Sequence, residues 1–271
     1  MLKDFSNIFL ISDLDGTLLT GEKRISESDR ASIAEFIEQG GHFAIATGRV
    51  RISAMPYIEQ VHANMPCILF NGGMIIDPKT GSVLWKKGLP PEAKDYVSEI
   101  LDAFPEAGAE LLTAEQAYAL RVDSILQYKI DFEKMHHIFI EPQEIREPWM
   151  KVLFTAEPEV IERISEFVRE RGYSGIFFVK SSDVYYEMLP EGVSKGAALH
   201  QMQRMDLFRG MKTAAVGDYM NDIEMIRYAD VGACVADSPG EVKEQADVVL
   251  TRTSNQDALT ELINHIKNIW R

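Results

Sequence analysis

The chain has 271 residues, of which 46% are hydrophobic and 26% are charged, and its formal net charge at pH 7 is −14. A chain of this length and composition can bury a sizeable core, as one large domain or as two smaller ones. The negative charge argues against nucleic acid or an anionic membrane surface as the main partner, because both favour clustered Lys and Arg. An anionic substrate would require a local exception, supplied by a bound cation or by a few basic side chains.

The first part of the chain, from residue 7 to about residue 71, alternates strands and helices in the order βαβαβ. Its strands are continuous apolar runs, as expected for a parallel sheet that is covered on both faces. Gly40 and Gly41 end the first helix. The predicted elements are strand 7–12, helix 26–39, strand 42–46, helix 51–63 and strand 67–70.

The pattern changes between about residues 80 and 190 to paired short strands with two or three helices. Turn signals at 77–81 and 190–192 mark the two ends of this stretch, where a hinge is expected. We therefore predict an inserted α+β unit over 81–189. Its clearest elements are strand 150–155, helix 158–171, strand 174–180 and strand 183–189.

The alternation of helix and strand returns from about residue 194. Segments 1–80 and 190–271 are expected to form one domain of the α/β class, with a Rossmann-like, doubly wound parallel sheet. The predicted elements of the second segment are helix 194–206, strand 211–216, helix 220–228, strand 231–235, helix 239–245, strand 247–250 and helix 256–269.

Two cysteines, Cys67 and Cys234, each lie in an apolar stretch. This placement predicts buried thiols and a reducing compartment, and not a disulfide framework. No signal-peptide pattern precedes the first predicted strand, and no apolar run approaches the roughly 18 residues that span a bilayer. We therefore expect a cytoplasmic protein without a membrane segment.

Two carboxylates, Asp13 and Asp15, directly follow the first predicted strand in the segment 13–18, Asp-Leu-Asp-Gly-Thr-Leu. Open α/β sheets bind ligands at the carboxyl ends of their strands. There, one carboxylate could attack an electrophile while its neighbour transfers a proton and both share a hard cation. The alternative is a surface turn, since Asp and Gly are common in turns. Matching segments downstream favour the functional interpretation.

Two further segments could bind an anion. Thr47 and Gly48 follow the second strand and precede a helix, so a hydroxyl and free backbone N–H groups would face the same crevice; an ordinary helix cap is the alternative. Lys195 lies in the first turn of a helix that Ser194 can cap, at the end where the helix dipole prefers anions. A Lys that points back to bind a phosphate-like anion explains this placement, and a solvated Lys is the alternative.

A fourth segment, 216–222, follows strand 211–216. Gly217 allows a tight turn, Asp218 lies at the strand end, and Asp222 lies one helical turn further on the same side. These acids are expected to converge with Asp13. Like charges this close repel each other unless a cation intervenes, and ligands that are all oxygens favour Mg²⁺ over softer metals.

Together and in this order, the four segments resemble the signature motifs of the haloacid dehalogenase superfamily of phosphohydrolases. The resemblance extends to segments 70–73, 189–196 and 221–225, which are similar to the Cof-type branch. In that branch a large α/β cap is inserted after the third strand, where the insertion is predicted here. The resemblance covers the whole predicted core.

The resemblance implies an Mg²⁺-dependent phosphomonoesterase that acts through an aspartyl-phosphate on a small phosphorylated substrate, such as a sugar phosphate or a phosphorylated cofactor. Asp13 would be the nucleophile, and Asp15 would protonate the leaving oxygen and then activate water. The phosphoryl group would be bound by Thr47, Gly48, Lys195 and Asn221. The metal would be bound by Asp13, the backbone carbonyl of Asp15, and Asp218, with Asp222 as a ligand or a support.

This chemistry places opposite demands on the two carboxylates after the first strand. A carboxylate cannot easily approach a phosphate dianion, so the cation and Lys195 must first neutralise the repulsion. Asp13 must stay ionised. Asp15 must be protonated when the ester leaves, so its pKa is expected to be raised by burial or by a partner.

Two segments depart from the family's pattern. Asp237 replaces the usual Asn in the segment 233–238, and segment 255–258, Asn-Gln-Asp-Ala, stands where the family has an acidic segment with a Gly. Both departures concern the rim of the site and the substrate, because no motif acid is changed.

The predicted insertion would contact the leaving group when it closes over the strand ends. Its candidate specificity residues, each of which could also serve packing, solvation or hydrogen bonding, are Arg121, His136, His137, Lys151 and the segment 185–187, Tyr-Tyr-Glu. The protein is expected to be a monomer or a small homo-oligomer.

Two other functions stay open at this point. A phosphomannomutase-like phosphotransferase would use the same motifs, but it should have a cap rich in Arg, and 81–189 holds five Arg without a cluster. A non-catalytic regulatory binding protein could keep the fold, although the intact motif acids and Lys195 argue against it.

Overall fold

The structure is a computed structural model that describes residues 5–133 and 136–270. The chain divides into two compact units, one formed by Met1–Lys86 with Val193–Arg271 and the other by Lys87–Gly192. The second unit therefore begins and ends later than the predicted range 81–189. The reason at the first boundary is strand β5, Val83–Lys86, which pairs with β4, Met74–Ile76, of the first unit.

A parallel sheet forms the centre of the first unit, with β1 between β12 and β2. All five residues of β1 are buried, as a strand covered on both faces requires. A parallel bridge from Ala46 to Ile68 extends this pairing to β3, Cys67–Leu69, which also begins an antiparallel sheet with β4 and β5. The strands of the parallel sheet, in spatial order, are β14 (Val248–Val249), β13 (Val231–Cys234), β12 (Lys212–Gly217), β1 (Ile8–Ser12) and β2 (His42–Ile45). The predicted α/β class with a parallel central sheet is confirmed.

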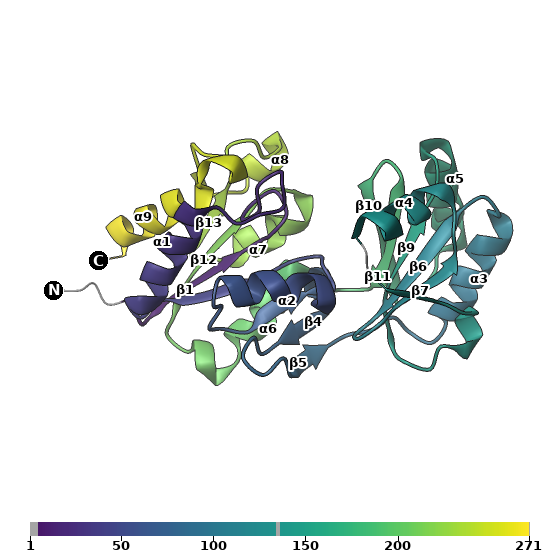
Figure 1. Cartoon of the computed structure of the whole chain (residues 1–271), viewed down its shortest axis with the longest axis horizontal. Coiled ribbons are helices and arrows are strands. Elements are labelled where there is room, and N and C mark those ends of the chain that lie inside the picture. The colour runs from purple at the N-terminus through teal and green to yellow at the C-terminus, as the bar shows by residue number, and fades with distance from the viewer. Residues whose placement is uncertain (1–4, 134–135, 271) are drawn as a thin grey trace. The chain divides into compact units, whose positions relative to one another are not determined.

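Helices cover this sheet, and two of them from opposite ends of the sequence pack together. The Ser26 side chain caps α1 by accepting a hydrogen bond from the Asp29 backbone N–H. Asp29 in turn accepts hydrogen bonds from the backbone and hydroxyl of Thr260 in α9, and the two helices lie side by side (Figure 1). The helices of the first unit are α1 (Glu27–Glu38), α2 (Arg51–Gln60), α6 (Lys195–Gln203), α7 (Ile223–Tyr228), α8 (Gly240–Lys243) and α9 (Ala258–Ile269).

One predicted helix of the first unit differs in an informative way. The range 220–228 begins as a 3₁₀ turn, Met220–Asp222, and becomes α-helical only at Ile223. The tighter turn brings the Asp222 carboxylate back to the backbone N–H groups of Asp218 and Tyr219.

The second unit contains a six-stranded sheet that is antiparallel except for the pair β7 and β8 (Figure 1). Apolar residues of α3 and α5 pack against one face of this sheet. Lys129 of α4 reaches Glu110, whose neighbours Ala109 and Leu111 belong to that apolar core, so α4 lies on the other face. In spatial order the strands are β10 (Ile176–Ser182), β11 (Tyr185–Pro190), β9 (Trp149–Thr155), β6 (Gly108–Thr113), β7 (Ala117–Arg121) and β8 (His137–Phe139). The helices are α3 (Ala93–Ala103), α4 (Ser124–Glu133) and α5 (Pro158–Arg171).

Two further expectations can be compared with the structure. Cys67 and Cys234 are both buried and free, which confirms the prediction of buried thiols. Across 5–133 and 136–270, no helix is both long enough and apolar enough to cross a bilayer.

Candidate active site

The candidate site forms where β1 and β12 end beside each other. Ser12 pairs with Val216, and the Asp13 backbone N–H donates to the Val216 carbonyl at 2.9 Å, so Asp13 and Asp218 follow neighbouring strands at one sheet edge. Gly16 allows the loop after β1 to lie directly against Asp218. Its φ is +85°, and a Cβ at this position would lie 2.3 Å from Asp218 Oδ2.

Lys195 connects two of the acids. Ser194 caps α6 by accepting a hydrogen bond from the Ala197 N–H at 2.8 Å, which fixes the first helical turn. The Lys195 side chain is 1% exposed, and its Nζ donates to Asp13 Oδ1 at 2.5 Å and to Asp222 Oδ1 at 2.6 Å. The alternative of a solvated Lys is therefore wrong: this cation is buried between carboxylates.

Asp222 also organises the loop that carries Asp218. Its second oxygen, Oδ2, accepts hydrogen bonds from the backbone N–H groups of Asp218 at 3.1 Å and Tyr219 at 3.2 Å. Asp218 Oδ1 accepts a hydrogen bond from the Thr17 hydroxyl at 3.3 Å. The N-terminal and C-terminal segments of the first unit are thus joined across the site by Lys195 on one side and by Thr17 on the other.

Burial and mutual repulsion shift the pKa values of the acids in this cluster. Burial raises the pKa of Asp13 well above its usual value; Lys195 opposes the shift, while Asp222 and Asp218 add to it. Burial also raises the pKa of Asp218 to about 6, with a further contribution from Asp222. For Lys195, burial alone would lower the pKa, but Asp13 and Asp222 outweigh it and raise the pKa, so the amine stays charged.

The acids have the arrangement and chemistry of a divalent cation site. Asp13, Asp218 and Asp222 each offer a carboxylate oxygen, and these oxygens lie within 4.8 Å of one another. Asp13 Oδ2 is buried and has no hydrogen-bond partner among the described residues. A buried carboxylate oxygen without a partner is costly, and ligands that are all oxygens suit Mg²⁺. The residues therefore fit the predicted metal.

The raised pKa values predict how stability depends on pH. The folded protein holds protons on Asp13 and Asp218 at pH values where the unfolded chain has lost them, so stability falls as the pH rises through this window. In EDTA, we expect a lower melting temperature at about pH 7.5 than at about pH 5. Added Mg²⁺ should reduce the difference, because the cation binds the ionised acids.

Scanning fluorimetry across this pH range, with and without Mg²⁺, measures the effect. Asp218→Asn is the matched control, since it removes one of the two titrating groups without changing the size of the side chain. A melting temperature in EDTA that depends on pH identically in both proteins would contradict the assignment.

Asp15 has surroundings different from those expected. Arg49 donates to Asp15 Oδ2 from Nε at 2.6 Å and to Oδ1 from Nη2 at 2.8 Å, and Lys23 Nζ donates to Oδ1 at 2.7 Å. Burial would raise the pKa of Asp15, but these hydrogen bonds outweigh burial and lower the pKa to about 2. The expectation of a raised pKa is therefore wrong for this state, in which Asp15 is a carboxylate paired with two cations.

The remaining predicted phosphate-binding residues belong to a network next to Asp15. The Thr47 hydroxyl accepts a hydrogen bond from the Arg49 N–H at 3.1 Å, and the Thr47 carbonyl accepts one from the Asn71 N–H at 3.0 Å. The Asn71 side-chain oxygen then accepts a hydrogen bond from Asn221 Nδ2 at 3.2 Å. Gly48 lies directly against the Asn71 amide. Thr47, Gly48 and Asn221 are thus linked through Asn71.

Several site residues were not given a role from the sequence. Asn71 has a φ of 53°, which Asn adopts more readily than most residues, and its place between Phe70 and Gly72 was the one available signal. Thr17 and Arg49 lie inside recognised motifs, but their partners are distant in sequence. Lys23 lies in a polar loop and gave no signal.

The candidate specificity residues of the second unit are mostly engaged in internal contacts. Arg121 donates to the carbonyls of Leu101 and Phe104, and His137 lies 2.6 Å from the buried Glu110. Lys151 forms an ion pair with Glu187 at 2.8 Å, and the Tyr186 ring stacks on Phe178. Tyr185 is half-buried and His136 is exposed.

Comparison with known proteins agrees with this geometry. Residues 10–263 match the family described as haloacid dehalogenase-like hydrolases. The chain belongs to this family. The match confirms the predicted haloacid dehalogenase family and the prediction of a hydrolytic enzyme of the phosphatase type.

Among curated relatives of this haloacid dehalogenase-like hydrolase, the 5-amino-6-(5-phospho-D-ribitylamino)uracil phosphatase YcsE of Bacillus subtilis is 27% identical over 255 residues, covering 93% of each chain. A solved haloacid dehalogenase-like hydrolase from Bacteroides thetaiotaomicron superposes with a TM-score of 0.85 at 24% identity, covering 96% of this chain and 99% of that one. A subclass IIB sugar phosphatase superposes with a TM-score of 0.80 at 19% identity, covering 97% and 100%. The two superpositions show the shared fold.

Proposed function

We propose that the chain is an Mg²⁺-dependent phosphomonoester hydrolase that acts on a small phosphorylated metabolite through an aspartyl-phosphate. The observation that carries the proposal is the state of Asp13: Lys195 binds one of its oxygens at 2.5 Å, and the other oxygen is buried without a hydrogen-bond partner in the described structure. The name of the YcsE relative specifies a phosphorylated ribityl compound, and the IIB neighbour is a sugar phosphatase. Both names support a small phosphate ester as substrate.

Asp13 is the proposed nucleophile. Its carboxylate oxygen would attack phosphorus, the bond from phosphorus to the ester oxygen would break, and an acyl phosphate would form on Asp13. Lys195 holds the carboxylate in place and supplies positive charge where two anions must meet. Thr47, Gly48 and Asn221 are proposed to bind the phosphoryl oxygens together with Lys195.

Asp15 is the proposed acid and base. In the first step it would donate a proton to the leaving oxygen, and in the second it would take a proton from the attacking water. Arg49 and Lys23 lower the pKa of Asp15 to about 2, so at neutral pH it is a carboxylate without that first proton. This state has the protonation that the second step requires.

The proposed Mg²⁺ ligands are Asp13, the backbone carbonyl of Asp15, and Asp218, with Asp222 as a ligand or a support. The cation would offset the negative charge shared by the carboxylates and the phosphoryl group. Asp222 already supports the site through Lys195 and the two backbone N–H groups that it accepts. We also propose that the second unit serves as the cap that determines which leaving group is accepted.

A phosphate-release assay tests this function directly. With 4-nitrophenyl phosphate and Mg²⁺ we expect release of inorganic phosphate that stops in EDTA and resumes when Mg²⁺ is restored, since the acids need the cation to admit a phosphate dianion. A panel of sugar phosphates and phosphorylated cofactors should then be assayed for free phosphate and for isomers. Isomer without phosphate would establish the phosphotransferase instead, and no reaction across the panel would establish a binding protein.

A further inference from the structure

We infer that Lys23 and Tyr57 are positioning residues for the second half of the reaction, in which water removes the phosphoryl group from Asp13. Together with Arg49 they form a brace, defined here as these three side chains, that orients the Asp15 carboxylate to accept a proton from water. The inference rests on the proposed function, since it concerns the acid and base of that reaction.

The brace contacts both oxygens of Asp15 but leaves them unequal. Oδ1 accepts hydrogen bonds from Lys23 and Arg49, whereas Oδ2 accepts one from Arg49 Nε at 2.6 Å. A carboxylate oxygen has two lone pairs, so Oδ2 can accept a further donor. The two contacts from the planar guanidinium and the third from the amine fix the plane of the carboxylate, which decides where that donor must lie.

Tyr57 of α2 holds both cations of the brace. Its hydroxyl donates to the Lys23 carbonyl at 3.1 Å, and the Arg49 guanidinium carbon lies 4.9 Å from the centre of its ring. A cation over an aromatic face is attracted electrostatically. One side chain thus places the two groups that orient Asp15, although it does not itself contact Asp15.

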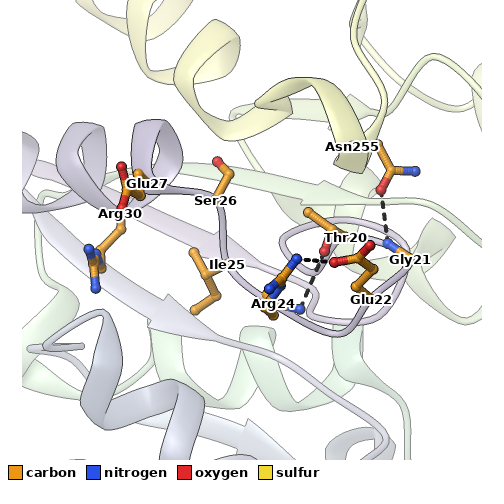
Figure 2. A pocket seen from close by; sticks show the side chains of 9 residues that line it. All are labelled: Thr20, Gly21, Glu22, Arg24, Ile25, Ser26, Glu27, Arg30 and Asn255. Atoms are coloured by element: carbon orange, nitrogen blue, oxygen red, sulfur yellow. Dashed lines mark hydrogen bonds and ion pairs between the residues drawn. The ribbon is translucent and has the colours of Figure 1, made fainter.

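The loop that carries Lys23 is shaped for this contact. Lys23 has a φ of +57°, an unusual value for a residue with a side chain, and its N–H donates to the Thr20 carbonyl at 2.8 Å. Figure 2 shows residues of this loop that line a cavity of about 580 Å³, where the Gly21 N–H donates to Asn255 Oδ1 at 2.9 Å. Asn255 belongs to the segment that departs from the family's pattern, and its hydrogen bond helps to fix the loop that carries Lys23.

The chemistry of the second step requires the orientation that the brace gives to Asp15. The water oxygen forms a bond to phosphorus, the bond from phosphorus to the Asp13 oxygen breaks, and its electron pair restores the Asp13 carboxylate. The water proton passes to Asp15. All three contacts on the Asp15 carboxylate come from donors, so Asp15 stays unprotonated and in a fixed orientation until the water arrives.

Lys23→Met is the main test, with 4-nitrophenyl phosphate as substrate because its leaving group departs without a proton. We expect kcat to fall roughly tenfold, because a misplaced base slows the second step, while kcat/KM stays within about twofold. Tyr57→Phe, which loses the hydroxyl and keeps the ring, should show the same pattern more weakly, and Lys23→Arg should recover most of the activity. In Lys23→Met, mass spectrometry of acid-quenched protein should show a phosphoryl group on Asp13.

Asp15→Asn and Lys79→Met complete the design. Asp15→Asn removes the base itself and should accumulate phosphorylated Asp13, whereas Lys79→Met changes an exposed Lys of the same unit and should behave as wild type. If Asp15→Asn accumulates the intermediate but the Lys23 and Tyr57 variants lower kcat and kcat/KM equally, the inference is overturned and the proposed function stands. If the wild-type enzyme releases no phosphate, or Asp15→Asn accumulates no intermediate, the proposed function fails and the inference fails with it.

Discussion

Asp13→Asn is expected to reduce phosphate release by about 10⁴-fold or more, because the substituted amide is a poor nucleophile for phosphorus. Binding of the substrate should change far less, since Lys195 and the network around Asn71 remain in place. Steady-state kinetics with 4-nitrophenyl phosphate measures the loss. A variant that keeps more than about a hundredth of the wild-type kcat would rule out Asp13 as the nucleophile.

The same substitution should not weaken the fold. Burial and the neighbouring acids make the ionised Asp13 unfavourable in the folded protein, so an uncharged residue of equal size removes a repulsion. In EDTA near neutral pH we expect the melting temperature of Asp13→Asn to equal or exceed that of the wild type. A lower melting temperature would show that the Asp13–Lys195 contact contributes more than the acidic cluster costs.

Lys195→Met is expected to have the opposite effect on stability, together with a loss of activity of about 10³-fold. The substitution preserves the length of an apolar stem but leaves Asp13 and Asp222 buried without their shared cation. Breaking a buried ion pair from one side costs about 3–5 kcal/mol. For a protein of this size the melting temperature should fall by on the order of 10 °C.

Two further variants accompany Lys195→Met, one as a control and one as a test of the charge interaction. Lys79→Met, at an exposed site of the same unit, should leave both the melting temperature and the activity unchanged. The double variant Asp13→Asn with Lys195→Met should be more stable than the sum of the two single effects predicts, because Asp13→Asn removes one of the two carboxylates that Lys195→Met leaves uncompensated. If the two effects simply add, the acids do not interact through Lys195 and the electrostatic account of the cluster is wrong.

The alternation of strand and helix made the core of the first unit predictable, because buried parallel strands are continuous apolar runs. Asp13, Asp218 and Asp222 could also be placed together, since each follows or lies close to the end of a strand in one parallel sheet. Lys195 was predictable for a different reason: a cation in the first turn of a helix is unfavourable unless an anion compensates it. In the structure that compensation comes from Asp13 and Asp222.

The sequence did not reveal contacts that arise only after the loops pack. The pKa of Asp15 was expected to be raised, but Lys23 and Arg49 reverse the shift, and neither residue carries a local signal of that contact. The compact second unit starts later than the predicted boundary because β5 is a short, largely exposed strand that becomes recognisable only through its pairing with β4. The predicted specificity residues of the second unit were chosen by type, and most of them prove to be satisfied by neighbours in that unit.

The discontinuous first unit has a consequence for the order of events during synthesis. The second unit is one continuous segment, whereas Lys195 and Asp13 are separated by 182 positions and meet only when the parallel sheet closes. Pairings between residues so distant in sequence form slowly, since the intervening chain must first be brought together. During synthesis the proposed nucleophile, Asp13, therefore emerges early and Lys195 emerges late, so an incomplete translation product should carry no phosphatase activity.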